Sequence, residues 1–432
     1  MSSAERPPGP GAELAGPVPA GERVDTLDVL RGFALLGILL VNIELFRGAD
    51  LYALLAGAAP ELSRADEIVQ FVVGWLAGGK FISSFALLFG VGAAIMAGRA
   101  LARGHSPRRL LARRYGWLLV FGLAHMFLLF PGDILFIYGL AGLALLPFVF
   151  VRPKALLWWA AGIAAAYLVF ALGSAALALG MEALAPEDVT DDPFTAGFEE
   201  FFAERHEQAV SAYTEGGLGA QAAARAWEVL FIQGSQLFLV PWVLALFLVG
   251  FAIGKSGLVA NLAGSRRLLR RVAALGLGAG LVLNLPLGFA GTLGGAAVGP
   301  DAETGGLLLL GVTTGQLLGA PLLAVGYLSA LALACLRPGV ATRLGPLRDA
   351  GRMALSGYVL QSVLAAGFFV SLGFYERLSS AQALGVVVAI WALMLAACAL
   401  WQRRVGRGPL ERLWRRLTYG PSRHPASRPG AH

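Results

Sequence analysis

The chain has 432 residues, of which 57% are hydrophobic and only 14% are charged. This composition is far more apolar than that of soluble domains, so it excludes a purely soluble protein. The formal net charge of +7 suggests a nucleic-acid partner at first sight. The basic residues border apolar stretches, however, where they would meet anionic lipid head groups. We therefore expect membrane lipids, and no nucleic acid, as partners.

Ten predominantly apolar stretches follow one another along the chain. Most of them are long enough to cross about 30 Å of hydrocarbon as helices. This pattern predicts an all-α fold, a polytopic integral membrane bundle of about ten transmembrane helices. The stretches cover residues 33–46, 81–98, 115–131, 133–151, 155–181, 231–254, 272–290, 307–336, 353–374 and 382–402.

The basic residues are distributed unevenly around these stretches. If the spans alternate in direction from a cytoplasmic N-terminus, all but six of the 34 Lys and Arg residues fall on the inner side. Lys and Arg in short loops set the orientation, because they stay on the cytoplasmic side during insertion. Both termini are therefore predicted to be cytoplasmic.

The composition divides the chain into three regions. Residues 1–22 are rich in Pro, Gly, Ala and Glu, which predicts a disordered cytoplasmic leader. A polytopic membrane domain follows over 23–404, and its acidic segment 182–230 is predicted to be an extracytoplasmic loop with a surface helix over 198–213. The acidic residues there are either a solvated face or a lid over a site. Residues 405–432 form a basic cytoplasmic tail, whose amphipathic part is expected on the inner leaflet.

Two segments do not fit the simple count of spans. Segment 64–79 is too short to cross the bilayer, so we expect it either at the outer interface or re-entering the membrane beside Lys80. Segment 307–336 is long and contains Pro321, which is accommodated by a tilt, a kink or a broken helix.

The residues that usually bind metals have no ligand spacing here. Cys335 and Cys398 both lie inside predicted spans and belong to no CxxC motif, so a disulfide framework is not expected. The five histidines also lack metal-ligand spacing. No metal is therefore expected.

Polar side chains at similar depth in several spans predict a buried polar layer. Asn42 and His125 each lie eleven residues after an arginine at the start of a span, and Gln361 lies nine residues after one. At about 1.5 Å per residue, all three lie roughly 14–17 Å from the cytoplasmic edge. Asn284, on a fourth helix of the same direction, is expected slightly higher. Ionisable groups inside spans are costly and are functional candidates by default.

His125 is the only histidine inside a predicted span, and an imidazole titrates near neutral pH. It is therefore a candidate general base or proton carrier, and the alternative is a neutral ring that ties helices together. Asp133 follows the turn made by Pro131 and Gly132. It is either the N-cap of the next helix or the carboxylate that orients His125.

A second group of candidates lies at the cytoplasmic edge. Asp28 and Arg31 are three residues apart, which predicts a local ion pair on one helix face. Alternatively, Arg31 binds an anionic phosphate group such as that of coenzyme A, and Arg352 with Ser356 offers a second such corner. No Walker loop, Rossmann GxGxxG or GxSxG motif occurs, so nucleotide hydrolysis is not supported.

Four ordered blocks resemble the YeiB-like bacterial membrane proteins, a family described as a domain of unknown function. The blocks are RVDTLDVLRGFALLGILLVNI, FISSFALLFGVGAAIM, GLAHMFLLFPGDILFIYGL and GPLRDAGRMALSGYVLQS. The resemblance extends from about Arg23 to Arg404. It implies a multi-pass protein of the bacterial inner (cytoplasmic) membrane.

The LDxxRG opening also resembles transmembrane acyltransferases of the heparan-alpha-glucosaminide N-acetyltransferase type and the bacterial sugar O-acyltransferases. In the O-acyltransferases, the polar position eleven residues past the arginine is typically histidine, whereas here it is Asn42. In the N-acetyltransferase type, the working histidine lies in the following outer loop, which contains no histidine here. We therefore assign the base role to His125, on its depth and chemistry.

These observations lead to one preferred function and two alternatives. The preferred function is a membrane-embedded acyltransferase, in which acyl-CoA is the co-substrate and an external glycan or lipid is the acceptor. The donor docks near Asp28, Arg31 and Arg352, while Asn42 and Gln361 hold the developing oxyanion. The alternatives are a transporter or exporter that uses a proton relay, and a scaffold or sensor without turnover. Glycine seams also permit a homodimer.

Overall fold

The computed structural model describes residues 25–58, 62–184, 193–292 and 302–420. Within these ranges every regular element is a helix and no strand occurs, which confirms the predicted all-α fold. The predicted leader, residues 1–22, lies outside the described residues, and so does the end of the tail from residue 421 onward.

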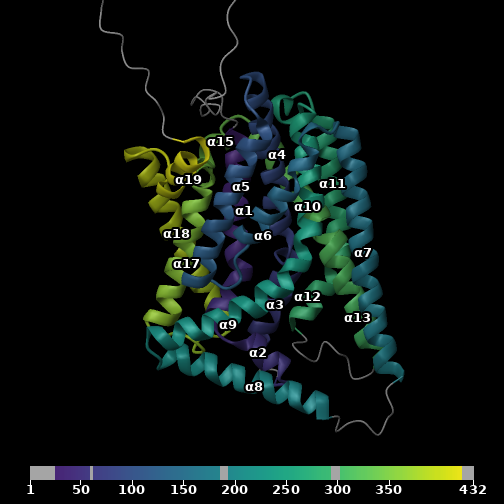
Figure 1. Ribbon diagram of the computed structural model, residues 1–432, viewed down its shortest axis with the longest axis vertical. Coiled ribbons are helices and arrows are strands. Elements are labelled where there is room, and N and C mark those ends of the chain that lie inside the picture. Colours follow the sequence, from purple (N-terminus) through teal and green to yellow (C-terminus); the bar gives the residue numbers. More distant parts are fainter. Residues whose placement is uncertain (1–24, 59–61, 185–192, 293–301, 421–432) are drawn as a thin grey trace, which may run out of the picture.

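The longer helices run mostly along the long axis of the molecule and pack side by side into a bundle (Figure 1). Ten of the described helices form this bundle: α1 (Asp25–Arg47), α4 (Lys80–Ala102), α5 (Pro107–Leu128), α7 (Pro153–Leu184), α10 (Val240–Lys255), α11 (Arg266–Leu283), α13 (Ala302–Thr314), α14 (Ala320–Cys335), α17 (Ala354–Ala366) and α18 (Ser380–Arg404). Helix α6 (Leu135–Ala144) lies inside the bundle, where it packs against α5 and α10 (Figure 1). The other helices connect these or cover the ends of the bundle: α2 (Asp50–Leu55), α3 (Arg64–Leu76), α8 (Pro193–Thr214), α9 (Leu218–Gln236), α12 (Leu285–Thr292), α15 (Val340–Arg343), α16 (Gly345–Arg352) and α19 (Pro409–Tyr419).

Seven helical segments among the described residues are long and apolar enough to cross a membrane. They are Asp25–Arg47, Arg64–Ala102, Pro153–Leu177, Leu218–Lys255, Leu308–Cys335, Ala354–Ser371 and Ser380–Arg404. The protein is therefore a membrane-embedded helical bundle, as predicted. The count of ten spans stays a prediction, because three expected spans coincide with α5, with α11 and with the short α6, and none of these is among the seven.

The two ends of the bundle differ in charge. The turns between α4 and α5, between α10 and α11, and between α14 and α17 lie at the same end as α19, the upper end in Figure 1. These turns carry the arginine clusters of the sequence, so we call this the arginine end. Helices α2, α8 and α9 cover the opposite end, which we call the acidic end (Figure 1). The arginine bias predicts that the arginine end faces the cytoplasm.

The surface helix predicted at residues 198–213 corresponds to α8. The helix is longer than expected and extends over Pro193–Thr214. Helix α9 follows after a short turn, and one 3₁₀ turn, Leu237–Leu239, separates it from α10. The predicted span 231–254 is therefore divided between two helices.

Glycine allows two of the bundle helices to approach each other closely. A Cβ atom at Gly276 of α11 would lie 2.7 Å from the carbonyl oxygen of Leu322 and 2.9 Å from the Cα of Gly326, both on α14. Any larger side chain would push α11 and α14 apart. Gly276 and Gly280 have the GxxxG spacing that allows close helix packing in lipid.

The long segment 307–336 forms one continuous helical segment, Leu308–Cys335, which contains one local irregularity. A π-helical turn, Gly315–Gly319, separates α13 from α14 just before Pro321. A second π-helical turn, Gly367–Ser371, ends α17. Such turns widen a helix locally and occur often at functional sites.

Segment 64–79 forms α3 and the turn that leads into α4. Helix α3 packs against α12 and α18, and the indole of its Trp75 donates to the carbonyl oxygen of Leu281 at 2.8 Å. Lys80, the first residue of α4, is completely buried, and its Nζ donates to the carbonyl oxygen of Gly74 at 2.8 Å. The ammonium group of Lys80 therefore turns back to close the end of α3.

Helix α19, in the predicted basic tail, packs against the bundle. The indole of Trp414 is buried and donates to the carbonyl oxygen of Arg114 on α5 at 2.9 Å. The guanidinium of Arg114 lies over the same indole, 3.6 Å from the ring centroid. Trp414 thus attaches α19 to the start of α5 at the arginine end.

Candidate functional site

His125 lies between a carboxylate and a hydroxyl group in the interior of the bundle. Its Nδ1 is 2.8 Å from Oδ1 of Asp133, and its Nε2 is 2.9 Å from Oγ of Ser362. The three residues are buried, with exposed fractions of 4% for His125, 0% for Asp133 and 2% for Ser362. The 2.8 Å contact does not have the geometry of a hydrogen bond, and neither His125 Nδ1 nor Asp133 Oδ1 has a hydrogen-bond partner among the described residues. The arrangement is that of a Ser-His-Asp triad.

The carboxylate is placed by a tight turn between α5 and α6. Pro131 and Gly132 reverse the chain after α5, and Oδ2 of Asp133 accepts a hydrogen bond from the backbone N–H of Phe136 at 2.9 Å. Asp133 therefore touches both of the groups between which the sequence left a choice, although the N-cap residue of α6 is Ile134. It accepts a hydrogen bond at the start of α6, and it lies against His125.

Tyr358 connects this triad to a cavity. It is buried on α17, one helical turn before Ser362, and its ring lies over that of His125 with centroids 4.8 Å apart. The hydroxyl of Tyr358 has no hydrogen-bond partner among the described residues. Tyr358 also lines the cavity described next, so one aromatic ring touches both features.

The cavity opens at the arginine end and has a volume of about 340 Å³. Its deeper walls are apolar and include Leu35, Phe85, Ile134 and Leu135. Six arginines line it, and we therefore call it the arginine cavity. They come from α1, α4, α5, α16, the turn before α19, and α19 itself. They are Arg31, Arg99, Arg114, Arg352, Arg407 and Arg415.

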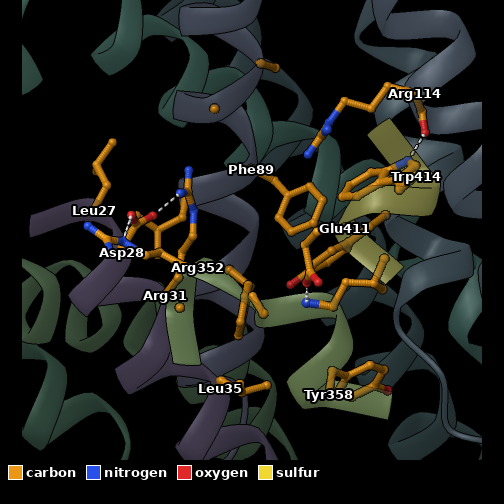
Figure 2. A pocket seen from close by; sticks show the side chains of 18 of the residues that line it. Leu27, Asp28, Arg31, Leu35, Phe89, Arg114, Arg352, Tyr358, Glu411 and Trp414 are labelled. Carbon is orange, nitrogen blue, oxygen red and sulfur yellow. Dashed lines mark hydrogen bonds and ion pairs between the residues drawn. The ribbon is translucent and has the colours of Figure 1, made fainter. Parts of the chain in front are cut away.

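The predicted corner of Asp28, Arg31 and Arg352 is assembled at this cavity (Figure 2). Arg31 Nη1 donates to Asp28 Oδ1 at 2.8 Å, which confirms the local ion pair expected from their spacing. Arg352 donates to Asp28 Oδ2 at 3.4 Å and to Asp25 Oδ1 at 2.7 Å. Figure 2 shows Arg114 and Trp414 on the opposite side of the cavity, with Phe89 between the two groups.

Ser356 does not belong to this corner. Its hydroxyl donates to Glu411 Oε2 of α19 at 2.5 Å and accepts from the backbone N–H of Leu410 at 3.1 Å. Glu411 Oε1 accepts from the backbone N–H groups of Leu355 and Ser356 at 2.8 and 3.0 Å. Ser356 therefore fastens α19 to the start of α17, and it is Glu411, not Ser356, that lines the arginine cavity.

The predicted polar layer is not one connected group. The Nε2 of Gln361 donates to the carbonyl oxygen of Leu35 on α1 at 3.3 Å. Asn284, at the end of α11, donates to a carbonyl oxygen of its own helix at 2.6 Å. Asn42 is partly buried in α1, and among the described residues no hydrogen bond joins these three amides to His125. Depth along a helix does not determine the direction in which a side chain points, so equal depth did not bring them together.

Ser362 and Tyr358 were not predicted from the sequence, although both lie in the block GPLRDAGRMALSGYVLQS, and Ser362 is its last residue. A depth argument would have found Ser362, since it lies ten residues after Arg352 whereas His125 lies eleven after Arg114. The spacing of four between Tyr358 and Ser362 places both side chains on one face of α17.

The chain is similar to several bacterial proteins over nearly its whole length. It is 30% identical over 425 residues to "Uncharacterized protein YxaH" of Bacillus subtilis (strain 168), an alignment that covers 93% of this chain and 96% of that protein. It is 29% identical to "Uncharacterized protein YeiB" of Escherichia coli (strain K12), over 92% of this chain and 96% of that protein. The family described as "Protein of unknown function (DUF418)" matches residues 253–421. No solved structure matches the chain.

Proposed function

The chain belongs to the YeiB-like, DUF418 family of membrane proteins, and from the geometry of its site we propose that it is an acyltransferase of the bacterial cytoplasmic membrane. It moves an acyl group from cytoplasmic acyl-CoA to an extracytoplasmic glycan or lipid. The observation that carries the proposal is the position of Tyr358. This residue lines the arginine cavity and touches His125. An acyl donor in the cavity therefore ends close to the hydroxyl group of Ser362, which is hydrogen-bonded to His125.

The charge of the arginine cavity suits the donor. Its lining contains six arginines but only two carboxyl groups, those of Asp28 and Glu411. Guanidinium groups bind phosphate oxygens through paired, charge-assisted hydrogen bonds. The apolar walls deeper in the cavity suit the pantetheine arm and a short acyl chain. The phosphates of coenzyme A therefore stay at the arginine end, while the thioester points toward Tyr358.

The triad supplies the chemistry of transfer. Ser362 Oγ attacks the thioester carbonyl carbon, and His125 Nε2 takes the hydroxyl proton as the new C–O bond forms. The C–S bond breaks, and His125 returns the proton to the departing sulfur of coenzyme A. The acceptor hydroxyl then attacks the Ser362 ester, gives its proton to His125, and leaves with the acyl group while Ser362 regains a proton.

Two further groups assist this reaction. Asp133 holds the proton on Nδ1 of His125, so that Nε2 is the free base. The unpartnered hydroxyl of Tyr358 is a hydrogen-bond donor for the oxyanion that develops on the carbonyl. Because the donor must pass the Tyr358 ring to reach Ser362, the ring turns aside when the thioester enters. The buried position of the triad excludes water and limits hydrolysis of the ester.

The test is to trap the acyl group on the protein. Purified protein in lipid nanodiscs is incubated with radiolabelled acetyl-CoA and with radiolabelled palmitoyl-CoA, then denatured and analysed by peptide mass spectrometry. We expect label on Ser362, and no label in Ser362→Ala or His125→Ala. Matched controls are Ser174→Ala on α7 and His105→Ala in the α4–α5 turn, which should be labelled normally. Without binding of either donor at saturation, the enzyme proposal fails.

Two other outcomes separate the parts of the proposal. If acyl-CoA binds and acyl transfer proceeds without label on Ser362, the acyltransferase function is supported, but the proposed ester on Ser362 is wrong. Donor binding is expected to weaken at least tenfold in Arg31→Ala and Arg352→Ala, but not in Arg267→Ala, which removes an exposed arginine of α11. Equal binding in all three variants would place the donor elsewhere.

Transport is the second candidate, and the π-helical turns Gly315–Gly319 and Gly367–Ser371 favour it. A π-helical turn interrupts the regular hydrogen bonding of a span, and such turns occur often at functional sites. A buried His125–Asp133 pair is also a suitable proton carrier. Movement of a solute into proteoliposomes without any acyl transfer would favour this function over the enzyme.

A further inference from the structure

A second cavity, of about 520 Å³, lies at the acidic end of the molecule, between α2, α8 and α9. Helices α2, α8 and α9 lie at the opposite end of the bundle from α19, which lines the arginine cavity (Figure 1). The lining of the second cavity includes Tyr52 from α2, Arg205 from α8, and Trp227 and Glu228 from α9. Small residues, mostly alanines of α8 and α9, form much of the rest of its wall. We call it the Tyr52 cavity.

Three hydrogen-bond donors that line this cavity have no partner among the described residues. They are the hydroxyl of Tyr52, Nε of Arg205 and the indole Nε1 of Trp227, and all three atoms are buried. Tyr52 as a whole is only 4% exposed. Buried donors without acceptors are costly and rare in folded proteins. Three of them around one cavity indicate a missing acceptor-rich ligand.

The donors are held in place by aromatic packing. The guanidinium of Arg205 lies 5.2 Å from the ring centroid of Trp227 and 5.1 Å from that of Phe201. The ring of Tyr52 stacks on Phe202 with centroids 6.2 Å apart. These contacts orient the side chains before any ligand arrives, which lowers the entropy cost of binding.

The cavity also offers an acceptor. Glu228 is buried, and its Oε2 accepts a hydrogen bond from the hydroxyl of Tyr213 at 2.8 Å. Burial raises the pKa of Tyr52 above its ordinary value, and the nearby Glu228 raises it further. Burial and Glu228 act on the pKa of Tyr213 in the same direction. Both hydroxyls therefore stay protonated and keep their role as donors.

The charge of the lining does not favour an anion. Arg205 is the single cationic side chain among the residues that line the cavity, while Glu207 and Glu228 are both carboxylic. The charge of Arg205 is balanced by that of Glu207, so the lining offers a phosphate or carboxylate ligand no net attraction. A ligand that accepts from three donors and also donates to a carboxylate carries several hydroxyl groups, and the indole of Trp227 and the alanines provide apolar contact for a sugar ring.

We propose that the Tyr52 cavity binds the sugar of the acyl acceptor, an uncharged, hydroxyl-rich ring presented from the extracytoplasmic side. This inference rests on the proposed acyltransferase function and names the class of its acceptor. The sugar is either part of a free glycan or the head group of a glycolipid, and both present the same hydroxyl chemistry.

Helix α9 connects this cavity to the reaction centre. Gln233, five residues after Glu228 and so about 7.5 Å further along the helix, donates to the carbonyl oxygen of Asp133 at 2.9 Å. Arg225 donates to the carbonyl oxygen of Leu128, at the end of α5, at 3.2 Å. The helix that forms one wall of the Tyr52 cavity therefore also holds the turn that carries the triad carboxylate.

The test measures sugar binding without any acyl donor. Protein in nanodiscs is examined by saturation-transfer difference NMR with methyl glycosides of glucose, galactose, mannose and N-acetylglucosamine, and with the same sugars on a diacylglycerol anchor in the disc. At least one sugar is expected to bind saturably. Binding only of the anchored form would identify a glycolipid, and binding of the free glycoside would identify a glycan.

Two variants remove a single donor each while keeping an aromatic ring. Tyr52→Phe and Trp227→Phe are each expected to weaken sugar binding by about three- to tenfold, the usual worth of one hydrogen bond. Trp159→Phe, on an exposed part of α7, is the matched control and should bind as the unmodified protein does. Since the hydroxyl of Tyr52 has no partner among the described residues, Tyr52→Phe should fold with undiminished thermal stability.

The proposal is overturned if no sugar of the panel saturates, if both variants bind with unchanged affinity, or if inorganic phosphate occupies the cavity in preference to sugars. Failure of this inference is distinct from failure of the acyltransferase. Loss of sugar binding would leave acyl-CoA binding at the arginine cavity intact, and an absence of acyl-CoA binding would leave sugar binding measurable.

Discussion

Gln233 and Asp133, a hundred residues apart in the sequence, are joined by a hydrogen bond of 2.9 Å from the side-chain amide of Gln233 to the carbonyl oxygen of Asp133. The same amide nitrogen donates to the carbonyl oxygen of Pro131 at 2.8 Å. One side chain of α9 therefore fixes both ends of the turn that places the carboxylate against His125. The turn is not held by its own residues alone.

Replacing Gln233 with leucine is expected to destabilise the protein by about 2 kcal/mol or more, because two buried carbonyl oxygens lose their donor. The measurement is the thermal unfolding midpoint in detergent. Gln208→Leu, at an exposed position of α8, is the control and should leave the midpoint nearly unchanged. Equal midpoints for the two variants would mean that the turn keeps its position without α9.

Replacing Asp133 with asparagine tests the positioning of His125. Asparagine still offers an oxygen to the backbone N–H of Phe136, so the start of α6 keeps this hydrogen bond and the variant should fold. The loss of the carboxylate allows the wrong imidazole tautomer, which in known triads lowers kcat about 10⁴-fold. We expect a large fall in kcat for acyl transfer with KM for acyl-CoA unchanged. A parallel loss of folded protein would instead indicate a structural role.

The contact between α1 and α16 leaves no space for a side chain at Gly32. A Cβ atom there would collide with the backbone carbonyl oxygen of Leu347, and one at Gly351 would collide with that of Asp28. Gly32→Ala is expected to cost about 1–3 kcal/mol by overpacking. It should also weaken acyl-CoA binding, because α16 carries Arg352.

The matched control for this substitution is Gly98→Ala. Gly98 lies inside α4, and no atom lies within 4 Å of the position that a Cβ atom would take there, so alanine should be neutral or stabilise the helix by about 0.5–1 kcal/mol. Thermal midpoints and acyl-CoA affinities are compared for the two variants. If Gly32→Ala behaves as Gly98→Ala does, then α1 and α16 move apart without loss of stability or of acyl-CoA affinity, and neither property depends on their close contact.

Glu411 anchors α19 through three hydrogen bonds to Leu355 and Ser356. Glu411→Ala is expected to free α19 from α17, and hydrogen exchange of the α19 amides should become faster by at least about tenfold, the effect of losing roughly one net hydrogen bond. Acyl-CoA binding should weaken as well, since Trp414 of α19 lines the arginine cavity. Glu215→Ala, at an exposed position after α8, provides the control. Unchanged exchange in Glu411→Ala would show that Trp414 alone is sufficient to hold the helix.

The parts of the site that sequence reasoning predicted depend on local contacts. Asp28 and Arg31 form their ion pair because a helix brings residues three apart onto one face. Asp133 meets His125 after a turn of only a few residues, in which Pro131 and Gly132 reverse the chain. Short separations leave few alternative arrangements, so residue type and spacing were sufficient.

The parts that sequence reasoning missed depend on contacts between distant segments. Ser362 lies 237 residues from His125, and the partner of Ser356 is Glu411, on a helix expected at the leaflet. Gln361 is buried, but its amide donates to the carbonyl oxygen of Leu35 and not to the His125 group. The Tyr52 cavity joins three helices of the acidic end, and nothing in the spacing of its residues indicated that they meet.

The sequence by itself determined that this protein is an all-helical membrane bundle with one arginine-rich end, because hydrophobic length and charge placement act on each segment separately. Only the tertiary structure decided which side chains face one another. The rotation of each helix about its own axis is set by packing against its neighbours, and that packing brought Ser362 to His125 and left Asn42 outside their hydrogen-bonded group.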